Sequence, residues 1–274
     1  MSEQRRFILK TLTAGGLSLV AAPFGFALAQ GRRAVERRVE PPMVAASSDL
    51  QPLLAEIVSG FEAQTQMKIR TVLGAEGRFY SQMLEGGAPF GMLLSADEKL
   101  IAQLPNTDKT ARRSDVYAIG RLAFYVPSGS PLRADNFLGD IRVALRDGRL
   151  QRLAIADPQV DAYGRLAEEV LHRKQVGEEI QPLLAIGDSV AQAAQIAVGG
   201  NVQGALVAYS QASQLMAARG GKCMLVSDTL CAPLRARMVL FENADDATRL
   251  FYDYMLSDRA RAVLRRYGYL IPAG

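Results

Sequence analysis

The 274-residue sequence has no tryptophan, one histidine and two cysteines. The histidine, His172, precedes Arg173 and Lys174 in a predicted helix, so we expect an exposed residue rather than a catalytic one. The sequence also lacks the G-x-S-x-G elbow, the H-E-x-x-H metal motif and the G-K-[ST] ending of a phosphate-binding Walker loop. These absences argue against the common hydrolases and nucleotide-binding enzymes, and we predict that the protein is not an enzyme and has no cofactor.

Cysteine and net charge are scarce as well. Cys223 and Cys231 could close a small loop as a disulfide, and the sequence leaves that open; metal binding through them is not expected without further soft ligands nearby. The net charge is +4, and it falls to +2 when residues 1–29, with three basic residues and one acidic residue, are set aside. A charge this balanced predicts no nucleic-acid partner.

A long uncharged stretch near the N-terminus runs from Thr11 to Ala29. It follows Arg5-Arg6-Phe7-Ile8-Leu9-Lys10, which resembles the twin-arginine export signature, and it ends in the small-x-small sequence Ala27-Leu28-Ala29. Gly15, Gly16, Gly25 and Pro23 would make it a poor membrane-spanning helix, although a retained anchor is the alternative. We predict that residues 1–29 are a twin-arginine signal peptide, cleaved to leave a periplasmic protein, and that residues 30–42 are a flexible leader.

The stretch from Leu73 to Asp97 predicts a strand end, a glycine loop, an amphipathic helix and a buried strand. Gly74 and Gly77 allow the backbone to turn tightly or to approach a ligand closely. The free N–H groups and the dipole of a helix N-terminus favour a small anion there. The plainer interpretation is a tight strand-to-helix connection with no ligand.

The same construction occurs earlier in the chain. Ser47-Ser48-Asp49 follows a predicted strand at Met43 to Ala46 and precedes a helix with one apolar stripe, for which Ser48 or Asp49 would be the N-cap. Further along, Asp188 or Ser189 is expected to cap a helix from Val190 to Val198.

Strands and helices alternate along the whole chain, which predicts an α/β protein with mainly parallel sheets flanked by helices. Two apolar segments, Tyr117 to Val126 and Arg237 to Phe241, are placed to cross between two lobes. We therefore predict the two-lobed fold of a hinged periplasmic binding protein. Its first lobe would comprise residues 43–121 and 236–274, and its second lobe residues 122–235.

Several short motifs together resemble the periplasmic molybdate-binding protein family, and they occur in the family's order between about Val44 and Tyr269. The motifs are Gly74-Ala75-Glu76-Gly77-Arg78-Phe79-Tyr80, Gly87-Ala88-Pro89-Phe90, Leu94-Ser95-Ala96-Asp97, Tyr117-Ala118-Ile119-Gly120, Ala156-Asp157-Pro158 with Tyr163-Gly164, and Tyr267-Gly268-Tyr269. The resemblance implies two α/β lobes that hold a tetrahedral oxyanion, such as molybdate or tungstate, through N–H groups and hydroxyls. It also implies a monomer that delivers this ligand to the membrane permease of an ABC transporter.

Carried over residue by residue, the family's ligand positions after the first strand and in the glycine loop fall on Asp49 and Glu76. In the second lobe they fall on Tyr163 and Val190, where backbone N–H groups would serve. The ligand-binding residues that we predict are these four with their neighbours: Ser47, Ser48, Asp49, Ala75, Glu76, Tyr163, Ser189 and Val190.

Asp49 and Glu76 depart from the family pattern, because a carboxylate replaces a neutral side chain at both positions. Two carboxylates would repel a divalent oxyanion, since unit charges about 4 Å apart interact by roughly 1 to 4 kcal/mol. Three interpretations remain open. Both residues cap their helices and turn away from the ligand; or they accept hydrogen bonds from a protonated oxyanion or a polyol; or they bind a metal ion or another cation. Sensing instead of transport is a further alternative.

Overall fold

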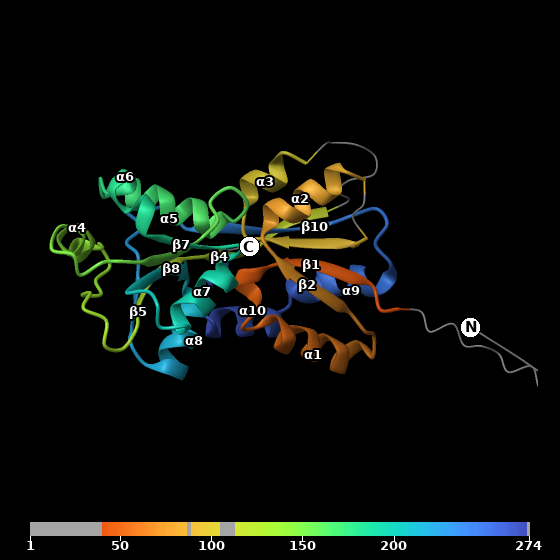
Figure 1. The fold of residues 1–274 in the computed structure, drawn as a ribbon. Helices are drawn as coiled ribbons and strands as arrows, with labels where there is room; N and C mark the ends of the chain where they lie inside the picture. Colours follow the sequence, from red (N-terminus) through yellow and green to blue (C-terminus); the bar gives the residue numbers. More distant parts are fainter. Residues whose placement is uncertain (1–39, 87–88, 105–112, 273–274) are drawn as a thin grey trace, which may run out of the picture. The chain divides into compact units, whose positions relative to one another are not determined.

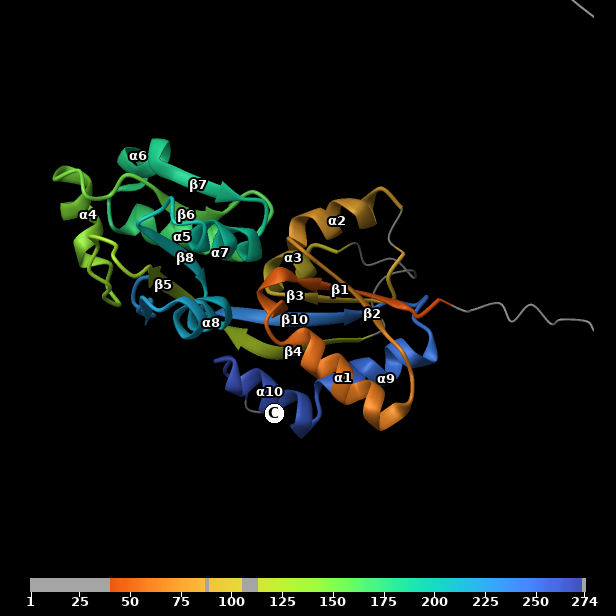
Figure 2. The ribbon, with the colours of Figure 1, turned by 60° about the horizontal axis from the view of Figure 1, so that its bottom comes forward.

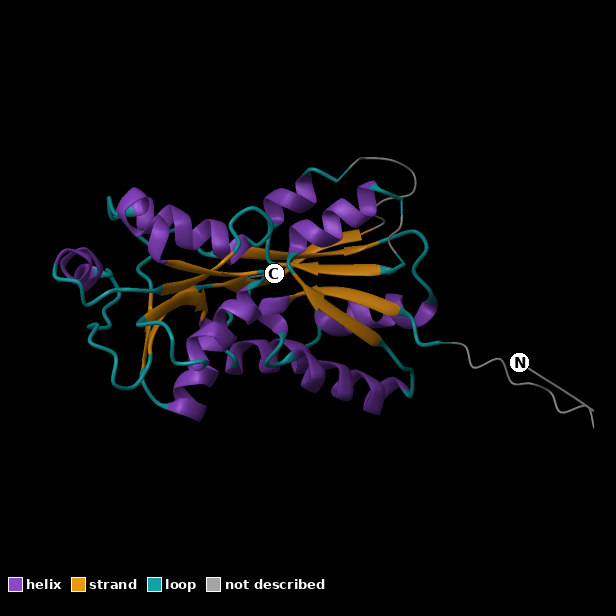
Figure 3. Cartoon of the chain, viewed as in Figure 1, coloured by secondary structure: helices purple, strands orange, loops and turns teal. Residues whose placement is uncertain are grey.

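The structure is a computed structural model that describes residues 40–86, 89–104 and 113–272. The predicted signal peptide, 1–29, and nearly all of the predicted leader lie outside the described residues. Residues from Glu40 onward form one compact unit, which contains two five-stranded sheets flanked by helices (Figures 1 and 3). We call the part around the first sheet lobe 1 and the part around the second sheet lobe 2. No helix in the described part is long and apolar enough to cross a membrane.

Lobe 1 is built on a sheet with the strand order β2-β1-β3-β10-β4. Its strands are β1 (Met43–Ser47), β2 (Arg70–Gly74), β3 (Met92–Ser95), β4 (Arg113–Gly120) and β10 (Leu234–Leu240). β1 pairs in parallel with both β2 and β3, whereas β10 is antiparallel to β3 and β4. Four strands therefore point one way and only β10 runs against them.

Lobe 2 repeats this arrangement with the strand order β7-β6-β8-β5-β9. Its strands are β5 (Leu122–Val126), β6 (Leu153–Ala156), β7 (Leu184–Gly187), β8 (Gly204–Ala208) and β9 (Lys222–Leu225). β6 is parallel to β7 and β8, and β5 is antiparallel to β8 and β9. Again one strand, β5, opposes the other four, so each sheet is mixed but mainly parallel.

The chain crosses from one sheet to the other twice. β4 and β5 are separated only by Arg121, and β10 brings the chain back beside β4 (Figure 2). In each sheet the reversed strand is the first strand after a crossing. This confirms the predicted two-lobed α/β fold with two crossover strands. The second crossover strand, β10, begins at Leu234 and includes most of the apolar segment predicted at Arg237 to Phe241.

The helices of lobe 1 are α1 (Leu54–Thr65), α2 (Glu76–Leu84), α3 (Glu98–Ala102), α9 (Asp246–Met255) and α10 (Asp258–Arg266). Asp245 and Ser257 cap α9 and α10, because their side chains accept hydrogen bonds from the N–H groups of Thr248 and Ala260. Phe61 packs edge-on against Phe251 and Tyr254, which joins α1 to α9.

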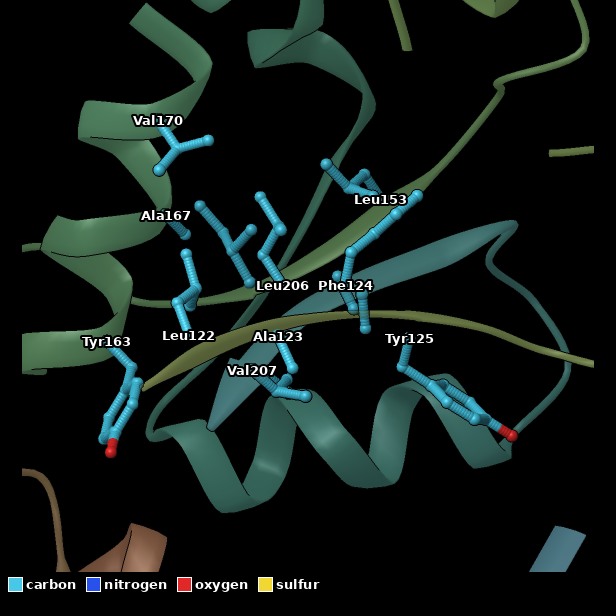
Figure 4. Close-up of a cluster of buried hydrophobic side chains, with 14 of the residues drawn as sticks. Leu122, Ala123, Phe124, Tyr125, Leu153, Tyr163, Ala167, Val170, Leu206 and Val207 are labelled. Carbon is cyan, nitrogen blue, oxygen red and sulfur yellow. The ribbon is translucent and has the colours of Figure 1, made fainter. Parts of the chain in front are cut away.

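Lobe 2 carries α4 (Gly139–Arg146), α5 (Ala162–Arg173), α6 (Gly177–Ile180), α7 (Val190–Val198) and α8 (Tyr209–Arg219). Figure 4 shows Phe124, Leu153 and Leu206 on the same side of the sheet as Ala167 and Val170 of α5, with Tyr163 at the edge of this core and its hydroxyl pointing away from it. Cys223 and Cys231 are both free, and burial raises the pKa of each thiol, so neither is an activated nucleophile. His172 is exposed, as expected.

Candidate functional site

The predicted site residues lie together at the carboxyl ends of the parallel strands of the two sheets. β1, β2 and β3 end at Ser47, Gly74 and Ser95. Ligands of open α/β sheets bind beyond the carboxyl ends of strands. The short 3-10 helix Ser48–Leu50 and α2 begin there in lobe 1, and α5, α7 and α8 begin at the corresponding edge of lobe 2.

Asp49 is completely buried in the 3-10 helix after β1. Its Oδ2 accepts hydrogen bonds from the hydroxyls of Tyr163, at 3.1 Å, and Tyr269, at 2.6 Å. Its Oδ1 is buried and has no hydrogen-bond partner within the described part of the chain. Burial raises the pKa of the Asp49 carboxyl, although the hydrogen bonds from Tyr269 and Tyr163 and the nearby Ser47 hydroxyl oppose that shift.

Glu76 is also completely buried, and its carboxyl is surrounded by donors from both lobes. Oε1 accepts hydrogen bonds from Ser47 Oγ at 2.5 Å and from the Ala96 N–H at 3.2 Å. Oε2 accepts a long hydrogen bond, 3.5 Å, from the Ala162 N–H at the start of α5. Burial, followed by the nearby charge of Asp161, raises the pKa of Glu76 to about 8. The Glu76 carboxyl thus takes up N–H and hydroxyl groups that could otherwise hold an external anion.

Asp161 is a third buried carboxylate, and the sequence analysis missed it. Its Oδ1 caps α5 by accepting hydrogen bonds from the N–H groups of Tyr163 and Gly164, and its Oδ2 accepts one from the Val190 N–H at 2.8 Å. Burial raises its pKa to about 6, because the three N–H groups offset only part of the desolvation. An aspartate directly before a helix is a recognisable N-cap signal, but the contact with Val190 is a tertiary one.

The structure brings all eight predicted site residues to this region, but it contradicts the capping interpretation. The N-cap of α1 is Leu53, four residues after Asp49, and the N-cap of α2 is Ala75, so Glu76 is already inside the helix. Neither cap residue makes a side-chain capping bond. Ser189 does cap α7, as predicted, whereas Asp188 is exposed and lies 3.3 Å from Arg78. That the eight residues contact a ligand stays a prediction.

Direct contacts hold the two lobes together around these carboxyls. The Gly77 N–H donates to the Val160 carbonyl at 2.8 Å, and the Ala191 N–H donates to Ser48 Oγ at 3.3 Å. Arg165 of α5 forms an ion pair with Asp97 of lobe 1. A pocket of about 290 Å³ opens beside Ser48 and is lined by residues of both lobes, among them Ser189 and Gln192. The structure is therefore closed over the buried carboxyls.

The cation interpretation gains no geometric support. Within the described part of the chain, no group of three or more histidine, cysteine, aspartate or glutamate side chains is arranged to hold a metal ion. Oxygen-binding cations usually require several such ligands at once. The backbone N–H groups of Ala96, Ala162 and Val190, which are directed at carboxyl oxygens, would also repel a cation.

We expect Tyr269→Phe to lower the free energy of unfolding by about 1 to 3 kcal/mol, because it removes the shorter hydrogen bond to the buried Asp49 carboxyl. Urea unfolding followed by circular dichroism measures the change. Tyr80→Phe is the control, because the Tyr80 hydroxyl donates to the Gln103 carbonyl in an exposed position. Equal stability of the Tyr269 and Tyr80 variants would show that the Asp49 hydrogen bond contributes nothing.

Both the sequence and the fold match known solute-binding proteins. The profile of the family described as "Bacterial extracellular solute-binding protein" matches residues 42–270. The molybdate-binding protein ModA of Rhodobacter capsulatus is 31% identical over 264 residues, which cover 95% of this chain and 97% of the relative. ModA of Azotobacter vinelandii is 31% identical over 246 residues, which cover 89% and 95%. The solved structure of the Azotobacter vinelandii periplasmic molybdate-binding protein superposes with a TM-score of 0.73 at 23% identity, covering 85% of this chain and all of that one.

Proposed function

Since this chain belongs to the bacterial extracellular solute-binding proteins, as a ModA-like member, we propose that it carries a small oxyanion in the periplasm to the membrane permease of an ABC transporter. One observation supports an oxyanion above all. Donors of both lobes are directed at one buried point, where each of them donates a hydrogen bond to the Glu76 carboxyl. These donors are Ser47 Oγ, the Ala96 N–H and the Ala162 N–H. A set of donors that accommodates a carboxylate also suits a tetrahedral oxyanion.

The ligand lies between lobe 1, residues 43–121 and 236–274, and lobe 2, residues 122–235. The ligand is contacted from lobe 1 by Ser47, Ser48, Asp49, Ala75 and Glu76. From lobe 2 it meets Tyr163, Ser189 and Val190. The protein works as a monomer, without enzymatic activity and without a cofactor. Its lobes open about the two crossover strands, and contacts made only in the closed form drive closure.

A thermal-shift screen followed by calorimetry tests this function. The purified protein is titrated with molybdate, tungstate, sulfate and phosphate, and we expect at least one of these oxyanions to bind with a stoichiometry of one and to raise the melting temperature. Manganese, zinc and calcium chloride serve as the comparison set. Binding of a metal ion with no response to any oxyanion would overturn the proposal in favour of a cation carrier.

We also propose that the twin-arginine route exports the folded protein and that the signal is cleaved after Ala29. Replacing Arg5 and Arg6 with lysine is expected to abolish export, because this route reads the arginine pair and not positive charge alone. Immunoblots of periplasmic and cytoplasmic fractions measure the result. Lys10→Arg, which keeps the charge in the same segment, is the control. An unchanged periplasmic yield of the double variant would contradict this route.

A further inference from the structure

We propose that the ligand is an oxyanion that keeps a proton at neutral pH, and that Asp49 selects it by accepting a hydrogen bond from that proton. The inference rests on the proposed oxyanion function and narrows it. Phosphate retains such a proton near neutral pH, whereas sulfate and molybdate do not. The relatives named for molybdate would then differ from this chain in the protonation of their ligand.

The first supporting feature is an unused acceptor among the buried carboxyls. Asp49 is completely buried, and both tyrosine hydroxyls that reach it donate to the same oxygen, Oδ2. Oδ1 has no donor among the described residues, although leaving a buried acceptor unpaired costs about 1 to 3 kcal/mol. The hydroxyl of Tyr117 is likewise buried without a partner there. A ligand with one O–H group and several unprotonated oxygens would satisfy both atoms: its O–H would donate to Asp49 Oδ1, and one of its oxygens would accept from the Tyr117 hydroxyl.

The second feature is the sign of the charges around this acceptor. Asp49, Glu76 and Asp161 are all buried at the site. The charges of Asp161 and Asp49 raise the pKa of Glu76, and the charge of Asp49 raises the pKa of Asp161. Arg165 of α5 is paired with Asp97, and Arg78 of α2 with Asp188. With Asp49 ionised, a fully ionised dianion would place a bare oxygen against a carboxylate oxygen without a proton between them. A protonated oxyanion places an O–H there and turns the repulsion into a hydrogen bond.

The remaining groups around Asp49 leave this assignment intact. The titratable side chains that act on it are Tyr117 from β4, Tyr163 and Asp161 from α5 and its cap, Glu76 from α2, and Tyr269 near the C-terminus. Burial raises the pKa of each of the three tyrosines, so all three stay protonated and can donate. With a pKa of about 8, Glu76 is mostly neutral at pH 7, which lowers the negative charge that an entering anion meets.

Calorimetry with phosphate, sulfate and molybdate at pH 7 tests the inference. We expect phosphate to bind the unmodified protein at least tenfold more tightly than either sulfate or molybdate. Asp49→Asn replaces an acceptor oxygen with an amide that can donate, so the ratio of phosphate to sulfate affinity is expected to fall at least tenfold. The control is Asp228→Asn in an exposed turn of lobe 2, which should leave this ratio unchanged.

The possible failures are distinguishable. Molybdate or sulfate binding to the unmodified protein as tightly as phosphate would overturn the inference and leave the oxyanion function standing. An unchanged ratio of phosphate to sulfate affinity in a folded Asp49→Asn protein would also overturn it, because Asp49 would then not distinguish a protonated oxyanion from an unprotonated one. No binding of any of the three anions by the folded protein would overturn the proposed oxyanion function itself. The measurement on the unmodified protein decides the matter even if Asp49→Asn does not fold.

Discussion

Replacing Glu76 with glutamine is expected to flatten the dependence of the free energy of unfolding on pH. The pKa of Glu76 is raised from 4.5 to about 8 in the folded protein, mainly by burial and by the charge of Asp161. Between these two values the folded protein holds a proton that the unfolded chain has lost, so stability falls as the pH rises through this window. Each pH unit removes up to about 1.4 kcal/mol for one such group. Glutamine stays neutral throughout and removes this contribution.

Urea unfolding of the two proteins at pH 5, 6, 7 and 8 measures the effect. The unmodified protein should lose stability steadily over this series, with Asp161 contributing only up to its pKa of about 6. The Glu76→Gln protein should lose much less above pH 6. Glu85→Gln at the exposed C-terminal end of the same helix is the control and should follow the unmodified protein. Parallel curves for all three proteins would show that Glu76 titrates normally.

Gly77→Ala is expected to hold the two lobes apart without weakening either of them. A Cβ atom at this position would lie 2.9 Å from both the Cα and the carbonyl oxygen of Val160 in lobe 2, closer than real Cβ atoms approach backbone. The Gly77 N–H makes a 2.8 Å hydrogen bond to the same carbonyl, so the closed form depends on this approach. Within α2 itself alanine is favoured over glycine by about 0.5 to 1 kcal/mol.

Small-angle scattering with saturating phosphate or molybdate, whichever binds, should therefore give a larger radius of gyration for Gly77→Ala than for the unmodified protein. Phosphate and molybdate affinities, whichever is measurable, should fall at least tenfold, or about 1.4 kcal/mol. The control is Ser81→Ala on an exposed position of the same helix, which should change neither quantity. Identical scattering and affinity for the glycine and serine variants would mean that closure does not require the Gly77 contact.

The buried carboxyls also explain why this site differs from a simple cavity for an anion. The N–H group of Val190, a position where the family's pattern places a ligand contact, donates to Asp161 instead. Ser47 donates to Glu76 in the same manner. The protein's own carboxyls satisfy donors that an external anion would otherwise have to satisfy, so a ligand must compete with them. On the inference above, this competition makes ligand binding depend on protons.

Local patterns in the sequence were sufficient for the architecture. The order of strands and helices, the glycine loop before α2 and the caps Ser189, Asp245 and Ser257 all follow from hydrophobic periodicity and from side chains that reach N–H groups two or three residues away. The ordered motifs from Val44 to Tyr269 identified the family, and they placed Asp49 and Glu76 at its ligand positions. These features depend on neighbours in the chain, so the chain alone reveals them.

Only the tertiary structure decided what the carboxyls do. Asp49 and Glu76 each precede or begin a helical segment, which locally suggests capping, yet Asp49 pairs with Tyr269, 220 residues away, and Glu76 reaches Ala162 across the lobe boundary. Asp161 contacts the N–H of Val190, and that pairing exists because parallel strands β6 and β7 end side by side. Whether a carboxyl is solvated or buried beside two others depends on how distant segments pack, and burial is what moves its pKa. Sequence periodicity determined the two lobes, and the packing of those lobes against each other determined the chemistry between them.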